Sequence, residues 1–356
     1  MKYYTGLDVS MQTTAICTVD QDGAVVFEDE IPTDPKLINM CLKANGHPID
    51  RLALESGSLS PWLVKELAKL GRKSLCVDAR TLAPFLALEV NKTDRNDARG
   101  IAEAIRCNCK KLKMVHPKSQ RSIELGTFLA TRRSLINQRT HIINTVRGLL
   151  KTYGIRLGVI GRKNIVEKVR ERILSEQEIT KSSLEALLVV FIKLDAEIET
   201  LNKELLLLAE KDEIICRLMT IPGIGPITAL TYKAEIDDPA RFKRSRAVGA
   251  YLGMTPTQYA SGQTKRQGRI SKCGSNELRS MLTEAAFVLL TRYKQPSSLK
   301  AWGLKIAGAQ GYKKAIVAVG RKLAVLMHRM WVDGKDFNLE ACEEIKLEEQ
   351  DGRQIA

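Results

Sequence analysis

The order of strand-like and helix-like segments in the first 115 residues limits the fold of this chain more than any other feature. Three short runs of β-forming residues come first, at 3–9, 13–19 and 25–27, with an Asp-Gly turn before the last. The later segments are a helix at 35–44, a strand ending at Glu55, a helix from Ser60 to about Gly71, a strand at 74–77 and a helical stretch at 79–112. This order predicts an α/β sheet in which a three-stranded meander is extended by strands that alternate with helices.

Four carboxylates occupy related places in this pattern. Asp8 lies on the first strand, Glu55 ends the fourth, and Asp94 and Asp97 are three positions apart on the last helical stretch, where they share one face. Three antiparallel strands followed by alternating helices and strands is the element order of the ribonuclease H architecture, in which acids at such places can converge. Asp8 also lies within an apolar run, where a buried carboxylate needs a compensating partner.

These four acids predict a two-metal centre for phosphoryl transfer. Two hard cations about 4 Å apart hold the attacking and leaving oxygens of such a reaction, and they require oxygen ligands. Mg²⁺ suits this donor set best, with Mn²⁺ as the usual substitute. Gly6-Leu7-Asp8 also resembles the opening of actin-like kinases and ATPases, but the following residues lack the phosphate-binding glycine of those proteins. The nuclease-like interpretation is therefore favoured.

The charge of the chain indicates a polyanionic partner. Its 356 residues include 56 Lys and Arg against 41 Asp and Glu, with a pI near 9.4. No run approaches the roughly 18 consecutive apolar residues of a membrane-spanning helix, and the N-terminus does not resemble a signal peptide, so we expect a cytoplasmic protein without membrane contact. Its eight cysteines are interpreted as reduced thiols. Cys107 and Cys109 with His116 do not match a zinc spacing, which favours a structural role.

Beyond His116-Pro117 the pattern changes to long helices. One is predicted over 119–153, with an apolar stripe and many arginines. A second carries a heptad seam over four repeats, formed by Leu184, Leu187, Phe191, Leu194, Ile198, Leu201, Leu205 and Leu208. Such a coiled-coil seam fits an internal helical hairpin and an oligomerisation arm equally well, and the pattern alone does not choose between them.

The third region begins at a Gly-x-Gly turn formed by Gly223 and Gly225. It resembles the helix-hairpin-helix motif, in which backbone N–H groups reach a nucleic-acid phosphate at a helix N-terminus. The alternative is a tight turn that packs two helices. Both interpretations predict helices on either side of the turn.

The most basic part of the chain follows this turn. Between Arg241 and Arg279 there are nine Lys and Arg residues and one acid, Glu277. We interpret 255–272 as a flexible loop that follows a phosphate chain, with Lys265, Arg266, Arg269 and Lys272 as candidate nucleic-acid contacts. A serine before a glycine is usually a turn former, but its basic surroundings make Ser261 a candidate nucleophile.

Together these motifs resemble the DEDD transposases of the insertion-sequence one-ten family, which are relatives of the Piv DNA invertases. The resemblance covers about residues 1–335. At the N-terminal end it is carried by Gly6-Leu7-Asp8, Leu54-Glu55 and Lys92-Thr93-Asp94-Arg95-Asn96-Asp97-Ala98, which look like RuvC-like motifs. At the C-terminal end it is carried by 221–225, 252–256, Ser261-Gly262 and 269–272.

The resemblance implies an RuvC-like domain whose four acids bind Mg²⁺, and a C-terminal domain in which Ser261 attacks DNA to form a covalent 5′-phosphoserine. It further implies a prokaryotic, nucleoid-associated homo-oligomer, a dimer or a tetramer, and a structured non-coding guide RNA that pairs with donor and target DNA. It leaves open whether the acids and the serine act within one subunit or across subunits, and which donor and target sequences are used.

The resulting fold class is α/β plus all-α. We predict a catalytic domain at 1–115, a helical coiled-coil region for oligomerisation at 116–212, a helical transposase domain with the serine and the helix-hairpin-helix-like turn at 213–335, and an acidic tail at 336–356. Two other functions stay open. One is a RuvC-like junction nuclease or DNA invertase without a covalent serine intermediate. The other is a nucleic-acid-binding regulator with a degenerate site.

Overall fold

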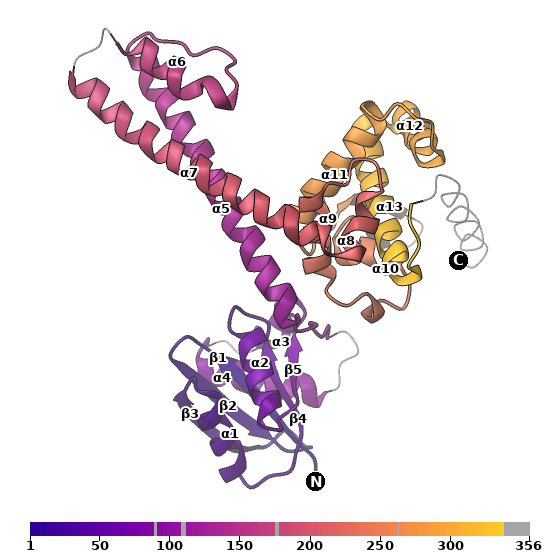
Figure 1. Ribbon diagram of the computed structural model, residues 1–356. Helices are drawn as coiled ribbons and strands as arrows, with labels where there is room; N and C mark the ends of the chain where they lie inside the picture. The colour runs from indigo at the N-terminus through magenta and orange to yellow at the C-terminus, as the bar shows by residue number, and fades with distance from the viewer. Residues whose placement is uncertain (89–90, 108–111, 175–177, 262–263, 338–356) are drawn as a thin grey trace. The chain divides into compact units, whose positions relative to one another are not determined.

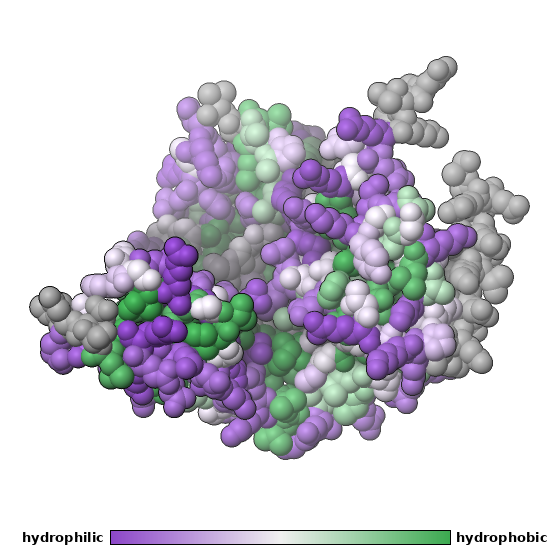
Figure 2. Space-filling view, turned by 90° about the horizontal axis from the view of Figure 1, so that it is seen from above, coloured by the Kyte–Doolittle hydropathy of each residue, from purple (hydrophilic) through white to green (hydrophobic). Residues whose placement is uncertain are grey.

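The computed structural model describes residues 1–88, 91–107, 112–174, 178–261 and 264–337 (Figure 1). It divides into two compact units, Met1–Ser119 and Gln120–Ala356. No helix within these ranges is long and apolar enough to cross a membrane. The face seen in Figure 2 is largely hydrophilic, with hydrophobic residues in separate patches.

A five-stranded sheet forms the centre of the first unit. Its strands are β1 (Tyr3–Val9), β2 (Thr13–Val19), β3 (Val25–Pro32), β4 (Ile49–Glu55) and β5 (Ser74–Val77). Their spatial order is β3-β2-β1-β4-β5, with antiparallel pairing from β1 to β3 and parallel pairing among β1, β4 and β5. This order fits the predicted ribonuclease H architecture, and the prediction of a mixed α/β N-terminal domain is confirmed.

Helices cover both faces of this sheet. The four helices are α1 (Pro35–Ala44), α2 (Ser60–Lys69), α3 (Ala79–Leu86) and α4 (Asp94–Arg106). Leu7 and Leu54 point to the face where Ile38 of α1 and Leu63 of α2 are buried. On the opposite face, Ala98 and Ala102 of α4 are buried against β2. Because side chains alternate along a strand, Gly6 and Asp8 point to the α4 face of β1.

The single helical stretch predicted at 79–112 is wrong, because α3 and α4 are separate helices. The Thr93 side chain accepts a hydrogen bond from the backbone N–H of Asn96 and so caps a new helix. The prediction followed the apolar periodicity and overlooked this cap. Asp94 and Asp97 consequently lie in the first turn of α4 rather than in the middle of a long helix.

Two long helices begin the second unit, α5 (Gln120–Thr152) and α7 (Glu178–Glu210), with the short α6 (Ile165–Arg172) between them. Val146 and Leu150 of α5 share a buried cluster with Leu184 and Leu188 of α7. An ion pair of 2.6 Å joins Arg139 to Asp195 across the two helices. The helices therefore form the internal hairpin, and oligomerisation through α7 stays a prediction.

The remaining helices surround one core. They are α8 (Glu213–Met219), α9 (Pro226–Ile236), α10 (Arg246–Tyr251), α11 (Asn276–Thr291), α12 (Ser298–Gln310) and α13 (Tyr312–Asp333). Leu129 of α5 and Leu205 of α7 belong to the same core, so the hairpin of α5 and α7 packs into it. The fully buried Tyr232 donates a hydrogen bond of 2.7 Å from its hydroxyl to the carbonyl of Ala324. The predicted helical C-terminal region is confirmed.

The flexible loop predicted at 255–272 is wrong for most of its length. Strands β6 (Pro256–Ser261) and β7 (Thr264–Ile270) pair in antiparallel fashion, with Ser261 opposite Thr264. The prediction gave too much weight to Gly, Ser and Thr, which are also compatible with a β-hairpin joined by two residues. Of the acidic tail predicted at 336–356, residues 338–356 lie outside the described part of the chain.

Candidate catalytic centres

Parallel pairing of β1 and β4 brings the first two acids together. Leu7 is paired with Leu54, so Asp8 and Glu55 are the next residues on neighbouring strands. Both side chains are partly buried. Glu55 is paired in turn with Val77 of β5 and ends its strand at the carboxyl edge of the sheet. The strand register therefore places two carboxylates side by side at one edge.

A glycine on β1 allows α4 to pack close to the two strand carboxylates. A methyl group at Gly6 would collide with the carbonyl oxygen of Ala98 and lie 2.6 Å from the backbone nitrogen of Ala102. Only a residue without a side chain allows the helix backbone to approach this closely. Asp97 precedes Ala98 on the helix, and Asp8 lies two residues beyond Gly6 on the same face of the strand. The close contact therefore brings the first turn of α4 to Asp8.

Asp97, Asp94 and Glu55 lie near enough to Asp8 for their negative charges to act on it. We call Asp8, Glu55, Asp94 and Asp97 the acidic cluster. Burial, followed by the negative charges of Asp97, Asp94 and Glu55, raises the pKa of Asp8 to about 6. Burial and the Asp97 carboxylate also raise the pKa of Glu55, and the ammonium of Lys92 opposes both shifts. These like charges would be relieved by a cation between them.

The donor set of the cluster fits a hard divalent cation, because carboxylate oxygens are the ligands such ions prefer. Within the described ranges, no group of three Asp, Glu, His or Cys side chains has a geometry that could hold a metal ion. Cys107 is exposed. Cys109, which the sequence analysis considered together with it, lies outside the described residues.

The predicted nucleophile lies at the end of a β-hairpin in the second unit. Ser261 is the last residue of β6, and Gly262, which follows it, lies outside the described residues. Lys265 pairs with Ala260 in the ladder, and Tyr259 with Arg266. The side chains of Arg266, Arg269 and Lys272 are exposed, and the Tyr259 ring is 65% exposed. The hairpin thus combines cations with an aromatic ring, the side-chain types that contact phosphates and bases.

A buried arginine holds the base of this hairpin. Arg279 of α11 is only 7% exposed. Its Nη1 donates to the carbonyl oxygens of Leu252 (3.1 Å), Cys273 (2.7 Å) and Gly274 (3.1 Å), which flank the two strands. Its Nη2 donates to the side-chain oxygen of Asn276 at 3.2 Å. The arginine therefore ties the entry and exit of the hairpin to one helix.

Backbone packing makes the hairpin base rigid. Gly253 has a φ of +66° and Gly274 a φ of +73°, both in the left-handed region. A methyl group at Gly253 would collide with the backbone of Cys273. Lys272 adopts a φ of +56° although it has a side chain, and its N–H donates to the Gly253 carbonyl at 3.0 Å. This conformation persists because the surrounding contacts enforce it.

The two glycines of the predicted helix-hairpin-helix turn differ in their surroundings. Gly223 has a φ of +89°, and a methyl group there would lie 2.8 Å from the carbonyl oxygen of Ala285 on α11. Gly225 is the residue before α9, and nothing lies within 4 Å of the place where its side chain would begin. Gly223 therefore packs two helices, while the open surroundings at Gly225 leave room for a ligand. Their role in nucleic-acid binding stays a prediction.

Sequence reasoning missed two residues that shape these centres. Arg279 has no distinguishing local pattern, because its three carbonyl partners come together only through tertiary structure. Lys92, whose charge opposes the raised pKa values of Asp8 and Glu55, lies two residues before Asp94 in the sequence and could have been noticed there.

Comparison with known proteins was consistent over most of the chain. A model of the DEDD transposases of IS110 elements, described as "Transposase", matches residues 5–155. A second, described as "Transposase IS116/IS110/IS902 family", matches residues 216–302. The chain is 28% identical to the transposase for insertion sequence element IS1111A of Coxiella burnetii, over 90% of this chain and 87% of that one. It is also 28% identical to the transposase for IS1328 of Yersinia enterocolitica, over 70% and 74%. A pilin gene-inverting protein of Moraxella bovis is 29% identical over 34% of this chain and 38% of its own.

A mixed sheet with acids at one edge, followed by a helical unit, fits a nucleic-acid-processing enzyme, and the matches identify its class as transposase. Because the two models match both halves in order, the chain belongs to the DEDD transposases of the IS110 family. It is thus an enzyme that cuts and rejoins DNA.

Proposed function

We propose that this transposase cleaves and rejoins DNA through the acidic cluster and Ser261. The observation that carries the proposal is the geometry of β1, which sets Asp8 beside Glu55 in the strand register and, through the contact at Gly6, beside the first turn of α4. Burial, followed by the charges of Asp97, Asp94 and Glu55, raises the pKa of Asp8 accordingly. Such a cluster is unfavourable by itself and is explained by a cation that it holds. Asp8, Glu55, Asp94 and Asp97 would bind Mg²⁺, with Mn²⁺ as a substitute. When bound, the ion supplies charge neutralisation at the reacting phosphate.

The proposed nucleophile is the hydroxyl of Ser261. Its oxygen forms a bond to the phosphorus of one phosphodiester, and the bond from phosphorus to the 3′ oxygen breaks. The serine proton is lost to a base, and the departing 3′ oxygen takes up a proton to become a hydroxyl. The 5′-phosphoserine keeps the energy of the broken bond, so a 3′ hydroxyl of another strand can reverse the step. Exposed Arg266, Arg269 and Lys272 would bind the flanking phosphates.

Trapping of a protein–DNA adduct tests this proposal. Denatured samples of wild type with its DNA should contain a covalent complex that depends on Mg²⁺, and Ser261→Ala should lack it. Ser280→Ala, which removes an exposed hydroxyl from α11 in the same unit, is the matched control and should retain the adduct. An adduct of undiminished yield in Ser261→Ala would remove this residue from the mechanism. Asp8→Asn should abolish cleavage while leaving DNA binding largely intact.

A hydrolytic nuclease or an invertase without a covalent intermediate is the second candidate function. The similarity to the pilin gene-inverting protein over part of the chain supports inversion of a DNA segment as a candidate activity. Both alternatives would use the acidic cluster with water or a DNA hydroxyl as nucleophile. Products with free ends, formed without any adduct in the wild type, would select them over the serine mechanism.

Guidance by a structured RNA and assembly into a dimer or tetramer complete the proposal. Both rest on the family resemblance, and the net charge of +15 supports binding of more than one nucleic acid. Purification from its host should co-isolate a transcript encoded beside the reading frame. If ribonuclease treatment leaves recombination of purified protein and DNA unchanged, RNA guidance is wrong.

A further inference from the structure

A basic segment precedes α10 in the second unit, away from the β-hairpin in sequence. It follows the short 3₁₀ turn η2 (Pro239–Arg241), and Arg241, Lys243, Arg244 and Arg246 occur within six positions without an acid. The side chains of Lys243, Arg244 and Arg246 are exposed. None of the three forms an ion pair with another described residue. This segment therefore carries charge that the rest of the described unit does not neutralise.

Contacts with α13 fix the backbone of this segment. The ring of His328 is 2% exposed and lies 3.0 Å from both the Pro239 carbonyl and the Ser245 hydroxyl. A carbonyl only accepts, so Nε2 donates to Pro239 and Nδ1 accepts from Ser245. Burial lowers the pKa of His328, which keeps this neutral arrangement. The basic segment is therefore held in place before any ligand arrives.

Aromatic packing accounts for one cation of the segment. The Arg241 guanidinium lies 4.6 Å from the ring centre of Phe242 and 4.4 Å from that of Tyr251. The Phe242 ring packs edge-on against His328 at 5.5 Å. Arg241 thus belongs to the support of the segment. Lys243, Arg244 and Arg246 have no such role.

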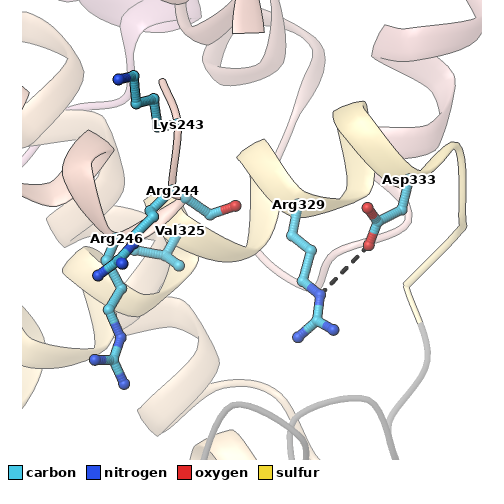
Figure 3. A pocket seen from close by; sticks show the side chains of 7 residues that line it. Lys243, Arg244, Arg246, Val325, Arg329 and Asp333 are labelled. Carbon is cyan, nitrogen blue, oxygen red and sulfur yellow. Dashed lines mark hydrogen bonds and ion pairs between the residues drawn. The ribbon is translucent and has the colours of Figure 1, made fainter. Parts of the chain in front are cut away.

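These residues line a cavity of about 490 Å³ against α13 (Figure 3). We call it the basic pocket, and its lining is Lys243, Arg244, Ser245, Arg246, Val325, Arg329 and Asp333. The lining contains four cations and one acid, Asp333, which pairs with Arg329 at 3.4 Å. The difference leaves an excess of three positive charges around the cavity. Guanidinium groups in such number match the paired oxygens of phosphate better than lysines would.

We propose that the basic pocket binds backbone phosphates of a nucleic-acid strand, at a place separate in sequence from the hairpin that carries Ser261. The inference rests on the proposed function in one respect, namely that nucleic acid is the substrate. Arg244 and Arg246 supply the phosphate contacts, and Val325 forms part of the apolar wall. Asp333 limits the affinity by its negative charge and by its pairing with Arg329.

The test measures binding by full-length protein in EDTA, so that no cleavage occurs and the nucleophile has no influence. Fluorescence anisotropy is recorded with labelled duplex DNA and with labelled RNA over a range of salt concentrations. Arg244→Gln/Arg246→Gln should weaken binding roughly tenfold and reduce the slope of log affinity against log salt by about 1 to 2. Asp333→Asn should strengthen binding, because it removes the only acid among the described residues that line the pocket.

Lys313→Gln/Lys314→Gln is the matched control, since both residues are exposed on α13 and neither lines the pocket. The control should change affinity by less than the pocket variant and should melt at a similar temperature. A loss with DNA alone, with RNA alone or with both supports the pocket and identifies the strand. Equal losses in the pocket and control variants, or no gain in Asp333→Asn, would overturn the inference. Because adduct formation is not measured, failure of the pocket and failure of the serine mechanism are distinguishable.

Discussion

Asp8 illustrates at the scale of one residue how the fold maintains an unfavourable charge. The strand places its carboxylate beside Glu55, and α4 adds two more acids. In the unfolded chain Asp8 is far from the other three acids and ionises independently of them. The folded protein must therefore ionise Asp8 against burial and repulsion, which is the reason for its raised pKa.

The stability of the cation-free protein should consequently fall as pH rises from about 4 to about 6. Between the ordinary value of 3.8 and the folded value of about 6, the folded state holds more protons at Asp8 than the unfolded state. The free energy of unfolding then decreases with pH across this window. Asp8→Asn should raise stability at pH 7.5 in EDTA by about 1–2 kcal/mol after allowance for solvent screening.

Chemical unfolding monitored by circular dichroism measures this difference. Asp22→Asn, at an exposed turn of the same unit, should leave stability nearly unchanged. Mg²⁺ should stabilise the wild type more than Asp8→Asn, because the ion binds the folded cluster. Equal stabilisation of both proteins by Mg²⁺ would contradict metal binding at Asp8.

A glycine at the crossing of β1 and α4 also decides the geometry of the cluster. Gly6→Ala places a methyl group against the carbonyl of Ala98, so α4 must move away from the sheet. We expect a loss of stability of at least about 2 kcal/mol and loss of DNA cleavage. Gly126→Ala is the matched control, because nothing lies within 4 Å of its position on α5. That control should gain a few tenths of a kcal/mol or more from helix propensity. Thermal melts and cleavage assays of both variants test the prediction.

The β-hairpin and its base show how one element is positioned by another. The strands β6 and β7 pair with each other and with no other strand among the described residues, so their direction depends on the hairpin base. Arg279 fixes that base through three carbonyls, and the glycines allow the backbones to touch. The arginine is therefore a positioning residue for Ser261, since it acts through the backbone of the hairpin.

Substitution of Arg279 should lower the rate of adduct formation more than it lowers DNA affinity. Arg279→Lys keeps the charge but cannot reach three carbonyls, so buried acceptors lose their partner. We expect a destabilisation of about 2–3 kcal/mol and a fall in adduct formation by roughly tenfold or more, with DNA affinity changed only slightly. Arg266→Lys keeps an exposed cation on the hairpin and should retain both properties. A variant with normal adduct rates at a temperature where it is folded would exclude a positioning role.

The hairpin of α5 and α7 links the element scale to the whole molecule. Its inner surface is used within the chain, where Leu184, Phe191, Ile198 and Leu205 are buried. The other side of α7 exposes Val189, Val190 and Ile192, and three successive leucines, Leu206–Leu208, are exposed near its end. Apolar residues gathered on the surface of a helix indicate a contact with another protein surface. A second copy of the chain fits the proposed oligomer.

Replacing exposed apolar residues on α7 should therefore weaken self-association without weakening the fold. In Val190→Glu/Leu207→Glu the charges lie on exposed positions, so the melting temperature should change little. Lys203→Glu, at an exposed polar position of the same helix, is the control. Sedimentation analysis should show the wild type and the control as a dimer or tetramer and the double variant as a smaller species. An unchanged assembly in the double variant would exclude this surface.

Charge distribution belongs to the whole molecule as well. The excess of 15 positive charges attracts nucleic acid at long range, while specific contacts depend on a few placed side chains. The hairpin and the basic pocket are the two places in the second unit that we propose for such contacts.

The sequence by itself determined most of the elements and indicated candidate reacting groups. Strand and helix periods are local properties, so β1, β2, α1 and the end of β4 were predicted within a few residues, as was α5. The heptad seam predicted that a second long helix exists, without its bounds. Asp8 could be named as a candidate because a carboxylate in an apolar strand run requires a partner, and Asp94 and Asp97 because residues three apart share one helix face. Local patterns gave a wrong prediction at Thr93, where a helix cap interrupts the helical period and separates α3 from α4. They gave another at 256–270, where strand pairing stabilises residues that are typical of loops.

Tertiary structure alone decided which of these groups meet. The approach of α4 to Gly6, the carbonyls around Arg279 and the pocket between the 243–246 segment and α13 join residues that are far apart in sequence. It also assigned the inner face of α7 to α5, which the heptad pattern left open. The physical reason is that the partner of a surface depends on packing and chain geometry in three dimensions, whereas a periodic pattern shows only that a partner is needed.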